Sequence, residues 1–298
     1  MHVLIPAAGS GSRMKAGKNK LLIELEGESL IFWTIKSVLS ASLVSWVGII
    51  GQPNDKQELL KSIKNFSNEV KWINGGETRQ ESVFNGLNSL PSNTEKVLIH
   101  DGDRCLIIDN LGKVLWPDKQ MMVYAKDILL TNKNEKIVYD VKSSKDLANV
   151  VKEYEGIPVM CRTGHSYIKM KMKEISAILG GEMSGHIFFK DRWYGFDDGH
   201  YSGARIIELI TKNNKCISEI SHSYGKFFST PELNINTTDD RKFEIVEEFS
   251  KNFSLSGEKV TIDGLRVNFK NGWALLRASN TTPKLVLRFE GDSQEDLD

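Results

Sequence analysis

Two groups of residues in this 298-residue chain have the types and spacing needed to bind phosphate groups. The first is a run of small residues, 6–14, which follows a short apolar segment, contains Arg13 and is followed by Lys20. Small residues let backbone N–H groups approach a phosphate, and the two cations can neutralise its charge. A tight turn between a strand and a helix is the alternative interpretation. Residues 75–83 form a second polar loop, which could contact a base edge or merely begin a helix.

The second group follows residue 140 and suits a sugar phosphate. Glu182 and Ser184 are one residue apart and can bind adjacent sugar hydroxyls. Lys142, His165 and His186 can orient a sugar and assist proton transfer. A phosphate dianion would be bound by a short loop of donors, namely Arg277, Ser279, Asn280 and Thr281.

Two pairs of aspartates could act in different ways. Asp101 and Asp103 are separated by one residue, and two such carboxylates can hold Mg²⁺, although the same spacing also occurs in turns. We interpret Asp197 and Asp198 as an N-cap of the following helix rather than as a catalytic couple.

The elements that must position these residues follow from the apolar pattern. Buried strands are expected at 3–5, 46–50, 70–73 and 97–99, and helical stripes between them predict a parallel sheet covered by helices. Further along, a helix at 118–131, a strand at 137–141 and a helix at 144–153 continue this alternation. The tail instead predicts paired strands at 260–262 and 265–269 and a closing strand at 285–289. The fold class is therefore α/β followed by an α+β part.

Composition narrows the class of protein. Lys plus Arg and Asp plus Glu are both 39, so the net charge of zero gives no support to nucleic-acid or anionic-membrane binding. No run approaches the ~20 apolar residues of a membrane span, and no signal peptide is evident. Three widely spaced cysteines suit a reducing compartment. We expect a cytoplasmic protein and leave its oligomeric state open.

The N-terminal motifs resemble the 2-C-methyl-D-erythritol 4-phosphate cytidylyltransferase family over residues 1 to about 101. The resemblance is carried by P-A-A-G-S-G-S-R-M at 6–14, by G-G-E-T-R-Q-E-S-V-F-N-G-L at 75–87 and by V-L-I-H-D at 97–101. It implies that Arg13 and Lys20 stabilise the transferring phosphate and that Asp101 binds the magnesium of CTP. It also implies a nucleotide-binding set of Ala8, Gly9, Gly11, Gly76 and Ser82, the last two contacting cytosine.

From Asp101 onward the motifs resemble the phosphomannomutase/phosphoglucomutase family. They include D-G-D-R at 101–104, Y-D-V-K at 139–142, G-E-M-S-G-H at 181–186 and R-A-S-N-T-T-P at 277–283. The resemblance implies a hexose phosphate as ligand, with Mg²⁺ at Asp101 and Asp103. It adds Arg104 to the catalytic set formed by Lys142, His165 and His186.

The two resemblances meet at residues 99–104. The mutase family has D-G-D-G-D-R where this chain has I-H-D-G-D-R, so Ile99 replaces the first carboxylate. We expect weak Mg²⁺ binding that Ile99→Asp strengthens and Asp101→Asn abolishes. No segment resembles the phosphoserine loop that donates the phosphoryl group in mutases, so we expect no mutase turnover.

We therefore predict a composite chain. A nucleotidyltransferase-like parallel-sheet half-domain occupies residues 1–100, and a metal-loop remnant occupies 101–113. A mutase α/β domain carrying the sugar loop spans 114–225, and an α+β domain with the phosphate loop spans 226–298. Three hypotheses follow: hexose-phosphate binding with mutase-type phosphotransfer by ancestry, CTP-dependent nucleotidyl transfer, and sugar-phosphate binding without catalysis.

Overall fold

The computed structural model describes residues 2–8, 19–42, 44–77, 79–94, 97–99, 104–109, 112–222, 224, 227–254 and 256–298. The chain divides into two compact units, Met1–Cys105 and Leu106–Asp298, and each is described by itself. None of the described helices is long and apolar enough to cross a membrane.

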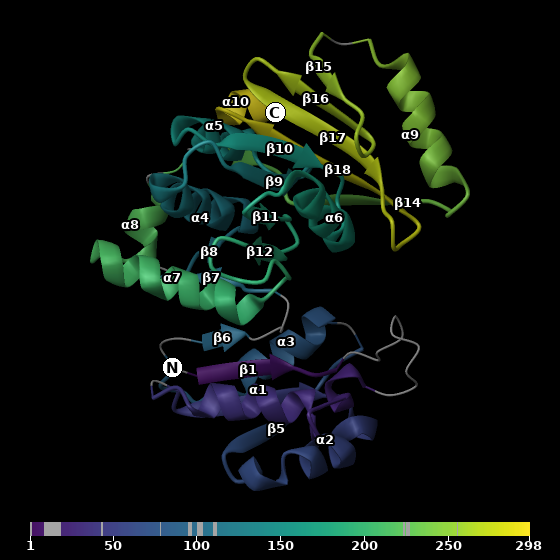
Figure 1. The fold of residues 1–298 in the computed structure, drawn as a ribbon. Helices are drawn as coiled ribbons and strands as arrows, with labels where there is room; N and C mark the ends of the chain where they lie inside the picture. Colours follow the sequence, from purple (N-terminus) through teal and green to yellow (C-terminus); the bar gives the residue numbers. More distant parts are fainter. Residues whose placement is uncertain are drawn as a thin grey trace. The chain divides into compact units, whose positions relative to one another are not determined.

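The first unit contains a parallel sheet in the order β5-β4-β1-β6 (Figure 1). Its strands are β1 (His2–Pro6), β4 (Trp46–Gly51), β5 (Val70–Asn74) and β6 (Val97–Ile99). Between them lie the helices α1 (Leu30–Leu39), α2 (Lys56–Ser62) and α3 (Arg79–Asn88). Short elements complete the unit: η2 (Lys20–Leu22), β2 (Glu24–Leu25), β3 (Glu28–Ser29), η3 (Pro53–Asp55) and η4 (Lys64–Phe66).

Helices cover both faces of this sheet. Successive side chains of a strand point to opposite sides, and here the side chains on both sides are apolar. Val3 and Ile5 of β1 pack with Ile31 of α1 and Leu59 of α2 on one face. On the other face Leu4, Ile50, Ile73 and Ile99 pack against residues that include Val83 of α3. The strands predicted at 3–5, 46–50, 70–73 and 97–99 are therefore confirmed, as is the parallel sheet.

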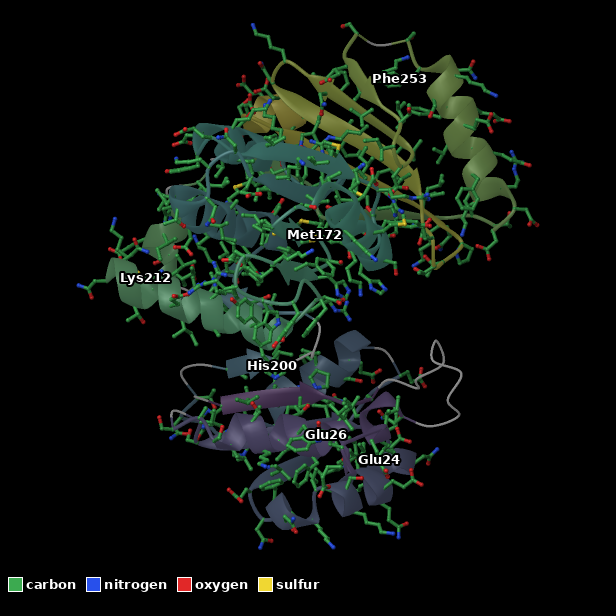
Figure 2. The ribbon with its side chains drawn as sticks, viewed as in Figure 1. Glu24, Glu26, Met172, His200, Lys212 and Phe253 are labelled. Carbon is green, nitrogen blue, oxygen red and sulfur yellow. The ribbon has the colours of Figure 1, made fainter. Side chains whose placement is uncertain are left out.

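The second unit begins with an α/β part whose sheet order is β10-β9-β11-β12. Its strands are β9 (Lys136–Asp140), β10 (Ile157–Cys161), β11 (Leu179–Gly181) and β12 (Ile187–Phe189), of which only β12 is antiparallel. The helices are α4 (Pro117–Thr131), α5 (Lys145–Glu153), α6 (His165–Ile175), α7 (Gly199–Asn213) and α8 (Ile217–His222), and β7 (Ile107–Ile108) pairs with β8 (Val114–Leu115). Met172, labelled in Figure 2, packs from α6 against Val138 and Phe188 of the sheet.

The last part of the second unit is an antiparallel sheet in the order β13-β18-β17-β16-β15, with β14 also paired to β18. The strands are β13 (Phe228–Ser229), β14 (Leu233–Asn236), β15 (Glu258–Val260), β16 (Leu265–Phe269), β17 (Gly272–Ala278) and β18 (Lys284–Gly291). Two helices, α9 (Arg241–Asn252) and α10 (Gln294–Leu297), accompany it (Figure 1). The predicted hairpin across Asp263-Gly264 is confirmed by the β15–β16 pairing. The helix α9 and the strand β17 were not predicted.

Buried side chains of this sheet hold the loop 141–144 of the α/β part. Arg266 donates to the carbonyl oxygens of Val141 and Ser143 at 2.6 and 2.8 Å. Its guanidinium lies 3.9 Å from the ring centre of Trp273, and burial lowers the pKa of Arg266 to about 10. Arg288 donates to the carbonyl of Lys142 at 2.6 Å. The C-terminal sheet thus fixes the backbone that carries Lys142.

Candidate functional sites

The described part of the nucleotide loop in the first unit comprises Ala7 and Ala8, directly after β1. Ala7 donates its N–H to Ile50 O at 2.6 Å, and its carbonyl accepts from Asn19 Nδ2 at 2.7 Å. Gly9, Gly11 and Arg13 lie outside the described residues, as does the side chain of Lys20, whose backbone begins η2. The described residues therefore fix the start of this loop and not its cationic part.

The second polar loop packs directly against the first. Ser82, which is 2% exposed, accepts a hydrogen bond from Gly76 N at 3.0 Å. Gln52 Nε2 donates to Gly76 O at 3.0 Å. A Cβ at Gly75 would lie 2.9 Å from Ala8 Cβ, so only glycine permits this approach. Both loops follow the carboxyl ends of parallel strands, β1 and β5, where α/β sheets bind ligands.

At the meeting point of the two resemblances, Ile99 is 8% exposed and belongs to the core with Leu4, Ile50 and Ile73. An aspartate at this position would therefore enter an apolar core. The expectation that Ile99→Asp strengthens Mg²⁺ binding is replaced by an expected loss of stability. Asp101 and Asp103 lie outside the described residues, among which no group of three or more metal-ligating side chains is found. Arg104 is partly buried.

In the second unit the sugar loop starts at the carboxyl end of β11. Glu182 is 3% exposed, and its Oε1 accepts from Gly164 N at 2.5 Å. Ser184 Oγ donates to Glu182 Oε2 at 3.3 Å. Burial, followed by the neighbouring Asp140 carboxylate, raises the pKa of Glu182, although Gly164 N–H partly offsets this. Glu182 therefore links the sugar loop to the loop that leads into α6 through its hydrogen bond with Gly164.

Asp140, at the end of β9, connects three further segments and was missed by the sequence analysis as a site residue. It is fully buried and accepts from Ser143 Oγ at 2.8 Å, Thr163 Oγ1 at 3.3 Å and Met183 N at 3.3 Å. A carboxylate that closes an apolar strand is the sequence signal that could have identified it, because buried charges in proteins are paired or hydrogen-bonded.

His165, the first residue of α6, and His186 lie together with their rings stacked at a centroid distance of 5.3 Å. Asp197 Oδ2 lies 3.0 Å from His186 Nδ1 and 3.8 Å from His165 Nδ1, and Lys169 Nζ lies 3.2 Å from Asp197 Oδ1. Burial alone would raise the pKa of Asp197, but His186, the backbone N–H of Asp197 and Lys169 hold it below its ordinary value.

The interpretation of Asp197 and Asp198 as one helix cap is therefore half right. Asp198 caps α7, because its Oδ1 accepts from the N–H groups of His200 and Tyr201, both at 3.0 Å. Asp197 instead faces the two histidines. Sequence adjacency concealed this difference, since neighbouring side chains outside a helix point in different directions.

The phosphate loop follows β17. Arg277 is a buried residue of that strand and not of the loop, and its Nε donates to Asp263 at 3.0 Å. Ser279 Oγ accepts from the N–H groups of Thr281 and Thr282 at 3.4 and 3.2 Å. Asn280 Nδ2 donates to Thr163 O at 3.4 Å, which links the phosphate loop to the segment before His165.

Lys142 follows the same strand end as Asp140. Its side chain is 9% exposed, and its Nζ lies 3.0 Å from Glu232 Oε2. Hydrogen bonds through Asp140, Thr163 and Asp263 thus join the sugar loop to Arg277 and Asn280, whereas Lys142 pairs with Glu232 and the two histidines face Asp197. Such a network offers acceptors for sugar hydroxyls, imidazoles for proton transfer and donors for a phosphate.

Comparison with known proteins gives two kinds of relative. The chain matches the 2-C-methyl-D-erythritol 4-phosphate cytidylyltransferase family over residues 1–151. It also matches the phosphoglucomutase/phosphomannomutase alpha/beta/alpha domain III over residues 116–227 and the C-terminal domain of that family over residues 232–298. The first match extends beyond the region in which the motifs show the resemblance, and it overlaps the second.

Individual relatives agree with this division. A 2-C-methyl-D-erythritol 4-phosphate cytidylyltransferase of Prochlorococcus marinus subsp. pastoris is 90% identical over 107 residues, 36% of this chain and 48% of that protein. A phosphomannomutase/phosphoglucomutase of Pseudomonas aeruginosa is 47% identical over 199 residues, 66% of this chain and 43% of that protein. The chain therefore spans less than half the length of either relative.

A solved structure supports the fold. The crystal structure of a phosphoglucomutase/phosphomannomutase family protein from Burkholderia thailandensis has a TM-score of 0.65 and 32% identity, covering 90% of this chain and 62% of that chain. Fold and motifs together define a composite α/β protein with a nucleotidyltransferase-like part and a phosphohexomutase part. The chain belongs to the 2-C-methyl-D-erythritol 4-phosphate cytidylyltransferase family by the match over residues 1–151, and its residues 116–227 and 232–298 match two domains of the phosphoglucomutase/phosphomannomutase family.

Proposed function

We propose that the second unit binds hexose phosphates, with sugar hydroxyls at Glu182 and Ser184 and the phosphate at Arg277 and the loop 279–281. The observation that carries this proposal is the hydrogen-bonded connection of the two loops through Thr163, which contacts Asp140, Asp263 and Asn280. A ligand with a sugar ring and one phosphate group matches the chemistry of both loops. The name of the Pseudomonas aeruginosa relative supports glucose and mannose phosphates as ligands.

Calorimetry with glucose 6-phosphate, mannose 6-phosphate and free glucose tests this proposal. Arg277→Ala is expected to weaken binding of the phosphorylated sugars by roughly 1.5–3 kcal/mol, the contribution of a charge-assisted hydrogen bond. Arg241→Ala is the matched control, because the side chain of Arg241 is 63% exposed and faces Glu244. Equal affinity of the wild-type protein for glucose and glucose 6-phosphate would refute the proposal.

Binding without turnover is the expected outcome in a mutase assay. No segment of the sequence resembles a phosphoserine loop, so the chain has no recognisable phosphoryl donor for Lys142, His165, His186 and Arg104 to serve. A coupled assay with a hexose bisphosphate activator should show no activity. A rate of ordinary magnitude, ~1–10³ per second, would reveal a donor that the motifs do not show.

The first unit supports a second candidate function, the binding of CTP with Mg²⁺. The favouring observation is the preformed contact between Gly76 and the buried Ser82, together with the approach of Gly75 to Ala8. Asp101 would supply a carboxylate oxygen of the kind that Mg²⁺ prefers, and Arg13 and Lys20 would neutralise the charge of the triphosphate. CTP-dependent pyrophosphate release with methylerythritol phosphate would extend this candidate to catalysis, and calorimetry with CTP tests binding alone.

A further inference from the structure

Asp263 makes contacts that none of the predicted roles requires. It lies in the turn between β15 and β16, and its side chain is 8% exposed. One carboxylate oxygen, Oδ2, accepts from Thr163 N at 2.9 Å and from Arg277 Nε at 3.0 Å. The other, Oδ1, accepts from Arg277 Nη2 at 3.4 Å. A single carboxylate therefore joins the segment before His165 to the buried arginine near the end of β17.

The turn itself fixes this carboxylate against Arg277. Gly264 has a φ of +80°, which disfavours other residues, and a Cβ there would lie 2.3 Å from Leu276 O and 2.7 Å from Arg277 Cα. The turn consequently rests on the backbone of β17 at the position of Arg277. Asp263 cannot move away from the guanidinium without displacing this turn.

The contacts also decide which donors of Arg277 remain for a ligand. A guanidinium carries five N–H donors in a rigid planar fork. Asp263 accepts from Nε and from one donor of Nη2, so the plane of the fork is set, and the two Nη1 donors and the second Nη2 donor remain for a phosphate. Asn280 Nδ2, in the phosphate loop, donates to Thr163 O. The N–H and the carbonyl of Thr163 are therefore both bonded to residues of the C-terminal part, Asp263 and Asn280.

We propose that Asp263 is a positioning residue that aims the Arg277 guanidinium at the ligand phosphate while tying it to the sugar-side loop. This proposal rests on the proposed binding of hexose phosphates. It predicts that Asp263 affects recognition of the phosphate only through Arg277. A carboxylate beside an arginine could alternatively weaken phosphate binding by neutralising its charge, and the two roles give opposite results.

The measured quantity is the dissociation constant for glucose divided by that for glucose 6-phosphate. This ratio isolates the contribution of the phosphate group to the binding affinity. Asp263→Ala is expected to lower this ratio about tenfold, which corresponds to the loss of one oriented charge-assisted contact. Asp263→Asn keeps an acceptor oxygen and should lower it less. In the Arg277→Ala background, Asp263→Ala should leave the ratio unchanged, because interacting residues are non-additive.

Asp239→Ala is the control for the loss of one negative charge near the same loop. Asp239 pairs with Lys242, whose Nζ reaches Thr282 O at 3.2 Å, and not with Arg277, which pairs with Asp263. An unchanged or increased ratio in Asp263→Ala, with a wild-type ratio well above one, would overturn the role of Asp263 and leave hexose-phosphate binding intact. A wild-type ratio of one would overturn both.

A second measurement keeps the proposal open to refutation if the alanine variant does not fold. In the wild-type chain, the Nε–H proton of Arg277 should exchange slowly with water, because a buried carboxylate accepts it. Nuclear magnetic resonance of the arginine Nε–H groups, with Arg277→Lys for assignment, measures this rate. Exchange as fast as that of the exposed Arg241 would contradict the proposed positioning.

Discussion

The two units bury polar groups in different ways. Among the described residues, the buried polar side chains of the first unit are Asn19, Ser29 and Ser82, and none of them carries a charge. The second unit buries many charged side chains, namely Asp118, Asp140, Lys142, Glu182, Arg205, Lys242, Arg266, Arg277, Arg288 and Glu290. The first unit is thus held mainly by apolar packing, and the second adds a network of charge-assisted hydrogen bonds.

This difference shows how each candidate site is built. In the first unit the buried Ser82 bonds to Gly76, only six residues away, and the longer-range contacts of this loop, from Gln52 and Ala8, involve no charged group. In the second unit Asp263 reaches Thr163 across 100 residues of sequence. Burying a charge is costly unless it is paired or hydrogen-bonded, and the carboxylates of Asp140 and Asp263 each accept several hydrogen bonds. The first site should therefore fail when a charge is inserted, and the second when an acceptor is removed.

The largest effect is expected from Ile99→Asp in the first unit. The substitution places a carboxylate among Leu4, Ile50 and Ile73, and the buried side chains described in this unit carry no charge. An uncompensated buried charge costs about 3–5 kcal/mol. Hydrogen exchange should show that β1, β4 and β6 lose protection, whereas Ile99→Val should cost only ~1 kcal/mol. Retention of full protection in Ile99→Asp would mean that the side chain does not face the core.

The second unit should respond most strongly to Asp140→Ala. Removal of this carboxylate leaves the donors of Ser143, Thr163 and Met183 without their acceptor. We expect a loss of about 3 kcal/mol, because each buried unsatisfied donor costs roughly 1–3 kcal/mol. Protection should fall in β9, β10 and β11 and remain in β1 and β4. Asp292→Ala removes a half-exposed carboxylate and serves as the control.

Periodic apolar patterns made most of the fold predictable. Residues 3–5, 46–50, 70–73 and 97–99 form the parallel strands that their apolar runs indicate. The composite ancestry was also predictable, since the cytidylyltransferase motifs and the mutase motifs after residue 116 lie in the regions that the two families match, although D-G-D-R at 101–104 precedes the mutase match. The strand β17 was missed because its end, Arg277-Ala278, belongs to a polar motif that suggests a loop.

The connecting carboxylates could not be predicted in the same way. Asp197 and Asp263 contact residues that are distant in sequence, and no periodic pattern of residues predicts such a contact. Asp197 lies beside a helix-capping residue, which offered a simpler explanation for both aspartates. The importance of Asp263 depends on the packing of the turn at Gly264 against β17, which only the three-dimensional fold brings about.

A pH profile distinguishes the second site further, through Glu182. Burial and Asp140 raise the pKa of this carboxyl, so it takes up a proton at a higher pH than an ordinary glutamate. A protonated Glu182 loses acceptor capacity, so affinity for glucose should decrease as the pH falls through this raised pKa, by up to about tenfold. Free glucose carries no titratable group here, so calorimetry with glucose over a decreasing pH series, run in parallel on the wild type and Glu182→Gln, measures this effect.

The sign of this effect separates it from acid unfolding. A carboxyl whose pKa is raised in the folded state binds its proton more tightly there, so protonation of Glu182 contributes stability as the pH falls. Loss of sugar affinity should thus occur without loss of fold. Glu182→Gln should bind glucose weakly and without this pH dependence. A wild-type profile identical to that of Glu182→Gln would contradict the role assigned to the carboxylate.

The smallest effect is expected from Ser82→Ala, which tests whether the first site is organised locally. The substitution removes the neutral hydrogen bonds between Ser82 Oγ and the backbone of Gly76, accepted from N at 3.0 Å and donated to O at 3.4 Å, and it leaves the apolar core unchanged. The cost should be about 1 kcal/mol, seen as roughly fivefold weaker binding of CTP and faster hydrogen exchange at Gly76. Ser89→Ala is the matched control, because Ser89 Oγ donates to Asn85 O just after α3 and away from Gly76. A loss of protection throughout β1, β4 and β5 in Ser82→Ala would show that this serine supports the whole unit, and the contrast between a locally built and a cross-linked site would then not hold.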